Sequence, residues 1–416
     1  MEKRVVITGM GAITPVVNNV KDFWDNLIAG KSGIDFVKGF DEVELPVRLV
    51  AQVKDFDPIS NGLDRSDIRK WDLFCQYAMA ASYQAMKDSG LVSEENIEAH
   101  RLGVYIGSGI GGVDVFVKET TKLLEEGAKR ISPLFVPTLI ANMASGNVAI
   151  KHKAEGPCLP VVTACATGTH AVGEAFLAIK NGMADAIIAG GTESAIHPLT
   201  IGGFANSKAL TNAKTVEEAC TPFDARRSGF TMAEGAGVLV LEEYEHACQR
   251  GATIYAEVVG YGNTCDAHHY TAPRADAIPA SNAIKIALEQ AAYVTDDVLY
   301  INAHGTSTPL NDKTETKAIK LALGEDLAYK ALISSTKSMT GHMLGAAGAV
   351  EVIACAMALK DGVVPPTINY QVPDPECDLN YVPNVAVEQP ISLAISNSLG
   401  FGGHNACVAL RRCNYE

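Results

Sequence analysis

Two stretches of this chain share one pattern of small residues, and that repeat constrains the fold more than any other feature. Residues 346–362 (AAGAVEVIACAMALKDG) align without gaps on residues 166–182 (ATGTHAVGEAFLAIKNG). Each pattern predicts a helix that is entered through small residues and ends at a glycine typical of a helix C-terminus. Ala-rich helices also resemble one another by chance. A second match, residues 254–262 with residues 5–11, each a predicted strand running into Gly-x-Gly, favours a duplicated α/β unit.

The repeat divides the chain into two predicted halves, residues 1–251 and 252–416. In the alignment Cys165 falls opposite Gly345, so only the first copy carries a thiol. We therefore expect an asymmetric site, with a nucleophile from the first half and helper groups from the second.

Cys165 lies at a predicted strand-to-helix junction. The apolar, β-branched residues 159–164 (LPVVTA) predict a buried strand, and helical spacing follows from Ala166 onward. At a helix N-terminus, unpaired N–H groups and the helix dipole favour a thiolate. The small neighbours allow another molecule to approach the sulfur. A buried structural cysteine is the alternative, because free cysteine is among the most buried residue types.

Composition excludes several classes of function. The ten cysteines contain no CxxC pair, which argues against a disulfide framework or a zinc ribbon and favours a reducing cytoplasm. The net charge of −14 argues against non-specific binding to nucleic acid or to membrane surfaces. The chain starts directly with a predicted strand and has no apolar stretch long enough to span a bilayer.

Three predictions concern the first half. Gly9-Met10-Gly11 is expected to form a tight turn after the first strand, and residues 64–90 to form one long amphipathic helix. Residues 107–112 (GSGIGG) match GxGxxG, but the segment that follows is polar and contains no second strand. A glycine-rich lining for a ligand is therefore preferred to a dinucleotide site.

Three predicted strands of the second half end in loops with polar or aromatic side chains. Residues 298–302 lead to His304, residues 331–335 to Lys337 and His342, and residues 391–397 to Phe401. Taken singly, each has an ordinary alternative interpretation: His304 as a core histidine, Lys337 as a solvated charge, and the glycines as simple turns. Ligands bind at the carboxyl ends of strands in open α/β sheets, so together with Cys165 they predict one site. The pair His268-His269 has no third ligand at metal-site spacing and predicts a loop.

Four motifs at these positions resemble the β-ketoacyl-acyl-carrier-protein synthases of the elongating class. They are TACATG (163–168), NAHGTSTPLND (302–312), STKSMTGHMLGAAG (335–348) and NSLGFGGHN (397–405). The resemblance implies a thiolase fold, with two duplicated α/β halves in a five-layered αβαβα core, and a homodimer. It implies decarboxylative Claisen condensation of malonyl-ACP with a Cys-bound acyl chain, without a redox or metal cofactor.

The resemblance also implies residue roles. Cys165 would be the acylated nucleophile, with its backbone N–H and that of Phe401 holding the thioester oxyanion. His304 and His342 would stabilise the enolate, and Lys337 would support them electrostatically with Glu351 as partner. Contacts with the malonyl or pantetheine part are expected from Thr271, Thr306 and Thr308. The acyl tunnel is expected to involve Phe401 as gate, Ile110, Phe204 and, from the other subunit, Phe135. His404 departs from the threonine of many relatives, which should affect packing more than chemistry.

An acidic carrier protein needs positive charge on this acidic chain. The candidates are Arg65, Arg69, Lys70, Lys129, Arg130 and Lys208; the alternative is a scattered solvated surface. Two other functions remain open. A cysteine hydrolase would need a Cys–His pair oriented by Asn or Asp. A non-catalytic carrier-binding subunit is disfavoured because Cys165, His304, Lys337 and His342 are all retained.

Overall fold

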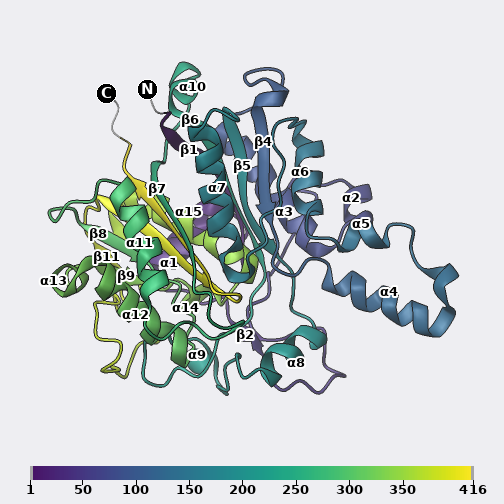
Figure 1. Cartoon of the computed structure of the whole chain (residues 1–416). Helices are drawn as coiled ribbons and strands as arrows, with labels where there is room; N and C mark the ends of the chain where they lie inside the picture. Colours follow the sequence, from purple (N-terminus) through teal and green to yellow (C-terminus); the bar gives the residue numbers. More distant parts are fainter. Residues whose placement is uncertain (1–2, 414–416) are drawn as a thin grey trace.

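A single mixed sheet organises the protein. The computed structural model describes residues 3–413, in which nine strands follow the order β4-β5-β6-β1-β7-β13-β12-β8-β9 (Figure 1). These strands are β1 (Val5–Ile13), β4 (Leu102–Gly107), β5 (Ala186–Glu193), β6 (Gly235–Glu243), β7 (Ala256–Cys265), β8 (Leu299–Asn302), β9 (Leu332–Ser334), β12 (Leu393–Gly400) and β13 (His404–Arg411). Two short ribbons pair β2 (Asp35–Phe36) with β3 (Leu49–Val50) and β10 (Val363–Val364) with β11 (Val387–Glu388).

Helices pack on the outer faces of the sheet, and others lie between its two parts. The longer ones are α1 (Val20–Ile28), α3 (Leu73–Ser89), α4 (Val113–Glu126), α6 (Met143–His152), α7 (Thr167–Lys180), α8 (Pro198–Asn206), α11 (Ile278–Gln290), α12 (Pro309–Leu323) and α15 (Ala347–Asp361). The shorter ones are α2 (Arg65–Lys70), α5 (Phe135–Leu139), α9 (Val216–Ala219), α10 (Tyr244–Gln249), α13 (Glu325–Ala328) and α14 (Lys337–Thr340), with 3₁₀ turns η1 (Ala99–Arg101), η2 (Ala128–Arg130), η3 (Ala164–Ala166) and η4 (Leu344–Ala346).

The layers follow the predicted thiolase arrangement. The sheet has two parts, one formed by β4, β5, β6 and β1 and the other by β7, β13, β12, β8 and β9. Among the described residues, the two parts pair only where residues 5–7 of β1 lie against residues 256–258 of β7. Helices α7 and α15 pack on each other and on strands from both parts, so they form the middle layer. Helix α3 covers β1, β5 and β6 from outside, and α11 covers β7 and β13. The predicted αβαβα fold is confirmed.

The glycines at the repeat's strands do not form turns. Gly9 and Gly11 lie inside β1, and Gly260 and Gly262 lie at corresponding places in β7. A Cβ on Gly9 would sit 2.2 Å from the carbonyl oxygen of Ala85 in α3, and one on Gly262 would sit 1.8 Å from that of Ala283 in α11. The predicted tight turn is wrong. In each half, glycine lets the outer helix approach the strand backbone.

Two other predicted elements are also corrected. The long helix over residues 64–90 breaks into α2 and α3, because the Asp72 carboxylate caps α3 by accepting the N–H of Phe74 at 3.3 Å. The buried strand predicted for residues 159–164 does not form: residues 159–163 belong to no helix or strand, and Ala164 begins η3. Pairing with β4 is limited to an isolated bridge between Cys158 and Val104, at which the N–H of Leu159 donates to the oxygen of Val104 at 3.0 Å, and Leu159 remains 52% exposed.

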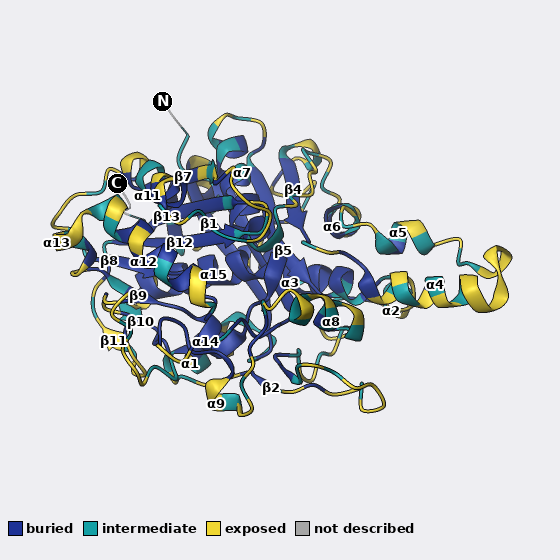
Figure 2. Cartoon of the chain, turned by 60° about the horizontal axis from the view of Figure 1, so that its bottom comes forward, coloured by how far each residue is buried: buried dark blue, intermediate teal, exposed yellow. Residues whose placement is uncertain are grey.

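An arm built from α4 and α5 projects from the body (Figures 1 and 2). It carries exposed apolar side chains, among them Leu124 at 80% and Val136 at 57% exposure. Such an unpartnered apolar surface is typical of a protein–protein contact. None of the helices within residues 3–413 is both long and apolar enough to cross a membrane.

Candidate active site

A strained turn presents Cys165. The sulfur-bearing residue lies in η3, directly before α7, and Ala164 has a left-handed backbone with φ of 50°. That conformation is rare for residues with a Cβ and marks functional sites. Gly400, at the end of β12, closes on this turn: a Cβ there would lie 2.8 Å from the oxygen of Thr163 and 3.4 Å from the nitrogen of Cys165. Glycine at position 400 therefore allows the two segments to meet.

Burial dominates the chemistry of the resting sulfur. It raises the pKa of Cys165 to about 12, against the lowering effects of the Lys337 charge and of hydrogen bonding from the backbone N–H groups of Phe401 and Cys165. The resting group at neutral pH is therefore a thiol, whereas helix position alone predicted a thiolate. The two N–H groups that were expected to hold an oxyanion both lie at the sulfur.

His304 follows β8 and is 3% exposed. Its position is set by the buried carboxylate of Glu315 in α12, which accepts the N–H of His304 and that of Gly305, both at 2.7 Å. Asn397 donates to the same carboxylate at 2.8 Å. Glu315 thus ties the His304 loop to the neighbouring strand β12.

His342 lies in the loop after α14 and is 2% exposed. Its N–H donates to the oxygen of Thr231 at 2.8 Å. The rings of His304 and His342 meet edge to face with centroids 5.3 Å apart. Burial lowers the pKa of both imidazoles well below the ordinary value, and the Lys337 charge lowers it further. Both are therefore neutral at pH 7, and the Nδ1 atoms of both have no hydrogen-bond partner within the described chain.

Lys337 is the first residue of α14 and is 1% exposed. Its ammonium group pairs with the buried carboxylate of Glu351 in α15, as predicted. Burial raises the pKa of Glu351 to about 7 although the Lys337 charge lowers it. The positive charge of Lys337 acts on Cys165, His304 and His342 and is shielded from water.

One cavity of about 320 Å³ joins these groups. Its lining includes Cys165, His304, His342 and Phe401, together with the predicted contacts Thr271, Thr306, Thr308 and Lys208. Within residues 3–413, Ile110, Phe135 and Phe204 are not part of this lining. Phe204 instead lies against Phe401 with ring centroids 6.3 Å apart, Ile110 donates its N–H to Glu193 at 3.2 Å, and Phe135 begins α5 on the projecting arm.

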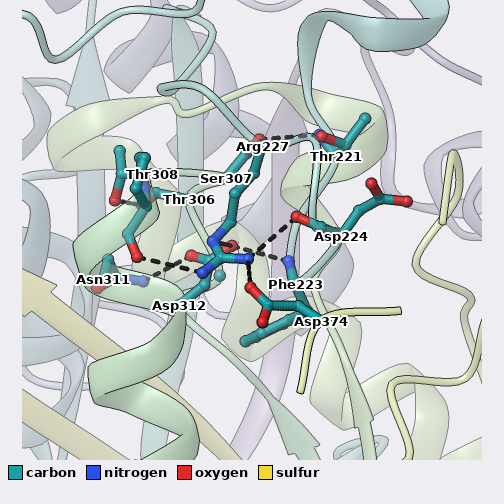
Figure 3. Close-up of polar contacts among 12 residues, drawn as sticks. Thr221, Phe223, Asp224, Arg227, Thr306, Ser307, Thr308, Asn311, Asp312 and Asp374 are labelled. Atoms are coloured by element: carbon teal, nitrogen blue, oxygen red, sulfur yellow. Dashed lines mark hydrogen bonds and ion pairs between the residues drawn. The ribbon is translucent and has the colours of Figure 1, made fainter. Parts of the chain in front are cut away.

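The wall formed by residues 306–311 is braced by Arg227, a residue that no sequence pattern indicated (Figure 3). The guanidinium pairs with Asp374 and donates to the oxygen of Pro309 at 3.3 Å. Thr306 and Thr308 share a hydrogen bond of 2.9 Å at the cavity. Arg227 is too far along the chain from this loop for any local pattern to connect them.

The predicted carrier-protein contacts lie on separate surface elements. Arg65, Arg69 and Lys70 are exposed on α2, Lys129 and Arg130 are exposed on η2, and Lys208 is exposed where it lines the cavity. Arg130 pairs with Glu126 at 3.0 Å. Of the six, only Lys208 is a lining residue of the site within the described chain.

A thiolase-like fold with a cysteine and two histidines in one cavity defines the class of condensing enzymes. The chain belongs to the β-ketoacyl synthase family: residues 2–247 match the model of the family's N-terminal domain, and residues 255–371 match the model of its C-terminal domain.

Named relatives and solved structures agree with this assignment. The chain is 50% identical over 412 residues to 3-oxoacyl-[acyl-carrier-protein] synthase 2 of Synechocystis sp., covering 99% of this chain and 98% of the relative. It is 50% identical over 410 residues to the synthase of the same name from Staphylococcus aureus, again covering 99% and 98%. A β-ketoacyl synthase from Burkholderia phymatum superposes with a TM-score of 0.91 at 34% identity, covering 99% and 100%. A type II polyketide ketosynthase, solved in complex with its acyl-carrier protein and bound to the hexaketide, superposes with a TM-score of 0.91 at 36% identity, covering 100% of both chains.

Proposed function

We propose that this chain is an elongating 3-oxoacyl-acyl-carrier-protein synthase, which extends an acyl chain by two carbons from malonyl-ACP. The observation that carries this proposal is the shared cavity of Cys165, His304 and His342, with the two imidazoles neutral and in contact. The matching carrier-protein synthases support the substrate class.

In the first step, the Cys165 sulfur attacks the thioester carbonyl of acyl-ACP. The new S–C bond forms as the C–S bond to the pantetheine breaks, and the proton of Cys165 ends on the departing carrier thiol. The backbone N–H groups of Cys165 and Phe401 stabilise the oxyanion, since both already lie at the sulfur. Covalent attachment splits one difficult condensation into two steps.

In the second step, malonyl-ACP enters the same cavity. Its C–CO₂⁻ bond breaks, CO₂ leaves, and the electron pair remains as an enolate whose oxygen accepts hydrogen bonds from His304 and His342. That charge develops in the transition state, where fixed donors in a dry site stabilise it most. The enolate carbon attacks the Cys165 thioester, a C–C bond forms, and the C–S bond to Cys165 breaks. The sulfur leaves as a thiolate and takes up one proton from solvent, which restores the thiol.

Geometry favours condensation over the two alternative functions. A cysteine hydrolase orients its histidine through an Asn or Asp side chain. Within the described residues, Nδ1 of His304 and Nδ1 of His342 have no hydrogen-bond partner of any kind. A non-catalytic partner subunit has no need for an open cavity at Cys165.

The proposal extends to organisation and partners. Two halves, residues 1–251 and 252–416, are supported by the matching glycine contacts of β1 and β7. A homodimer is supported by the exposed apolar side chains of the α4–α5 arm. Phe135 of this arm would reach the acyl tunnel of the other subunit, and Ile110 and Phe204 would line the tunnel within each subunit. A cytoplasmic location is supported by the cysteines, none of which forms a disulfide in the described chain.

The test is single-turnover assay of purified protein with acyl-ACPs of increasing length. We expect stoichiometric acylation of Cys165, followed by 3-oxoacyl-ACP only when malonyl-ACP is added. Release of free acid without malonyl-ACP would establish hydrolysis instead, and absence of acylation would favour the non-catalytic subunit. A Cys165→Ala variant controls for acylation elsewhere.

A further inference from the structure

The duplication leaves a second copy of the active-site framework, without its reactive groups. Strand β4 and its loop (VYIGSGIG, 104–111) match β8 and its loop (LYINAHGT, 299–306), which places Gly109 opposite His304. The strand pairing agrees with this alignment. Gly107 and Asn302, which the alignment matches, each form the last pair with the parallel neighbouring strand, Gly107 with Gly191 in β5 and Asn302 with Ser396 in β12.

The two cysteine-type turns also correspond. Leu344 in η4 has a φ of 48°, which matches the 50° of Ala164 in η3. A Cβ on Gly345, the counterpart of Cys165, would lie 2.7 Å from the nitrogen of Gly109. Gly345 and Gly109 therefore face each other in the second copy as Cys165 and His304 share a cavity in the first.

The carboxylate of Glu193 fills this second copy. Glu193 is the last residue of β5 and is fully buried. Oε1 accepts the hydroxyl of Ser108 at 2.8 Å and the N–H of Ile110 at 3.2 Å. Oε2 accepts the N–H of Gly109 at 2.9 Å and that of Gly345 at 3.0 Å. One side chain thus joins the β4 loop of the first half to the η4 turn of the second.

We propose that Glu193 is a positioning residue for the condensation, holding the Cys165 turn and the His342 turn in register by occupying the unused copy of the site. On one side, Gly109 lies against Ala164, the residue before Cys165: a Cβ on Gly109 would be 3.5 Å from the Ala164 oxygen. On the other side, Gly345 lies three residues after His342. This inference rests on the proposed function, because it concerns how the two half-sites meet.

A Glu193→Gln variant tests the proposal. Three of the four partners of Glu193 are backbone N–H groups and the fourth is a hydroxyl, so the amide of glutamine would turn its N–H group against at least one backbone donor. We expect kcat for condensation to fall by about 100-fold with KM nearly unchanged, because a small misplacement of reacting groups has that cost. Malonyl decarboxylation should stay within about threefold of wild type, because His304 and His342 both belong to the second half. Glu325→Gln, at an exposed position on α13, is the matched control.

Equal loss of both reactions, or no loss of either, would overturn the proposal. If Glu193→Gln does not fold, Ser108→Ala removes one of the four donors and keeps the carboxylate. It should lower condensation more than decarboxylation, by a smaller factor, and an unchanged ratio in that variant counts equally against the proposal.

A second readout is independent of the enzymatic reaction. The Glu193 charge raises the pKa of Cys165, so its removal should shift the pH dependence of Cys165 alkylation by iodoacetamide to lower pH. An unchanged profile would remove the link between Glu193 and the sulfur. If wild type itself fails to condense, the proposed function is wrong, while this profile still reports on Glu193.

Discussion

The rings of His304 and His342 lie edge to face with centroids 5.3 Å apart and an interplanar angle of 87°, although 38 positions separate them in the chain. The contact brings two neutral imidazoles to the cavity that holds Cys165. Two such groups can donate to one developing oxyanion without the cost of burying two charges.

Replacing either histidine by alanine should reduce malonyl decarboxylation by about 100-fold or more, the usual effect of losing one oxyanion donor. Transfer of the acyl group to Cys165 should fall less. Release of CO₂ from malonyl-ACP and radiolabel transfer to the protein measure the two steps, with His268→Gln as an exposed control. Equal loss of both half-reactions would contradict the division of labour.

The same histidines should add no inflection of their own to the pH dependence of decarboxylation between about pH 6 and 8, where Glu351 is the buried neighbour that titrates. Their pKa values are lowered well below the ordinary 6.5, so both stay neutral as the pH falls through that range. Initial rates of CO₂ release across the range provide the measurement. An inflection near pH 6.5 that persists in a Glu351→Gln variant would show that at least one imidazole titrates as if exposed.

Alkylation of Cys165 by iodoacetamide should be slow at neutral pH and should still rise above about pH 9. Burial raises the pKa from 9.0 to about 12, so the thiolate fraction keeps increasing there. Lys337→Ala should slow the reaction further, since the Lys337 charge lowers that pKa. Peptide mass spectrometry distinguishes alkylation of Cys165 from alkylation of Cys265. Because Cys265 is exposed, its alkylation confirms that the reagent is active. A plateau near pH 7 would mean that the helix N-terminus outweighs burial.

Gly400→Ala should reduce acylation of Cys165 by about 100-fold, because its Cβ would force the Cys165 turn to move. Thr163 contributes a backbone oxygen at 2.8 Å, which has no freedom to rotate away. Single-turnover acylation is the measurement. Gly146→Ala, where a Cβ meets no atom within 4 Å, is the matched control, and equal behaviour of the two variants would refute the close contact.

Removing Glu351 should destabilise the protein by about 3–5 kcal/mol, since Lys337 would keep a buried charge without its partner. Replacing both residues by methionine should recover most of that loss. Denaturant unfolding at one protein concentration gives the free energies. Glu126→Ala, which breaks the exposed pair with Arg130, should cost less than about 1 kcal/mol. A Glu351→Ala variant as stable as this control would exclude a buried ion pair.

Lys208→Glu should raise KM for acyl-ACP by about tenfold and leave the reaction with acyl-pantetheine unchanged. Lys208 lines the cavity, where an acidic carrier protein would deliver its substrate. The increase should shrink at high salt. Lys330→Glu is the control, because it reverses the same charge at an exposed position beside a different pocket. Equal KM values for the two variants would leave the carrier contact to the residues of α2 and η2.

Much of the site could be predicted because its residues follow predicted strands and carry recognisable motifs. Cys165, His304, Lys337, His342 and Glu351 lie together as the motifs implied. Errors arose where local pattern competes with distant contacts. Residues 159–164 have strand composition, yet pairing with β4 is limited to an isolated bridge at Cys158. Gly9 and Gly11 suggested a turn, because no local signal shows that α3 packs against them.

The sequence alone determined the duplication, the presence of the thiol in only the first copy, and the order of the motifs, since these depend on residue type and spacing. Tertiary structure decided the protonation of Cys165, because burial exceeds the effect of helix position there. It also decided the roles of Glu193, Arg227 and Glu315. Their hydrogen-bond partners come from other segments of the chain, and the free energy of a buried polar group depends on those partners rather than on its neighbours in sequence.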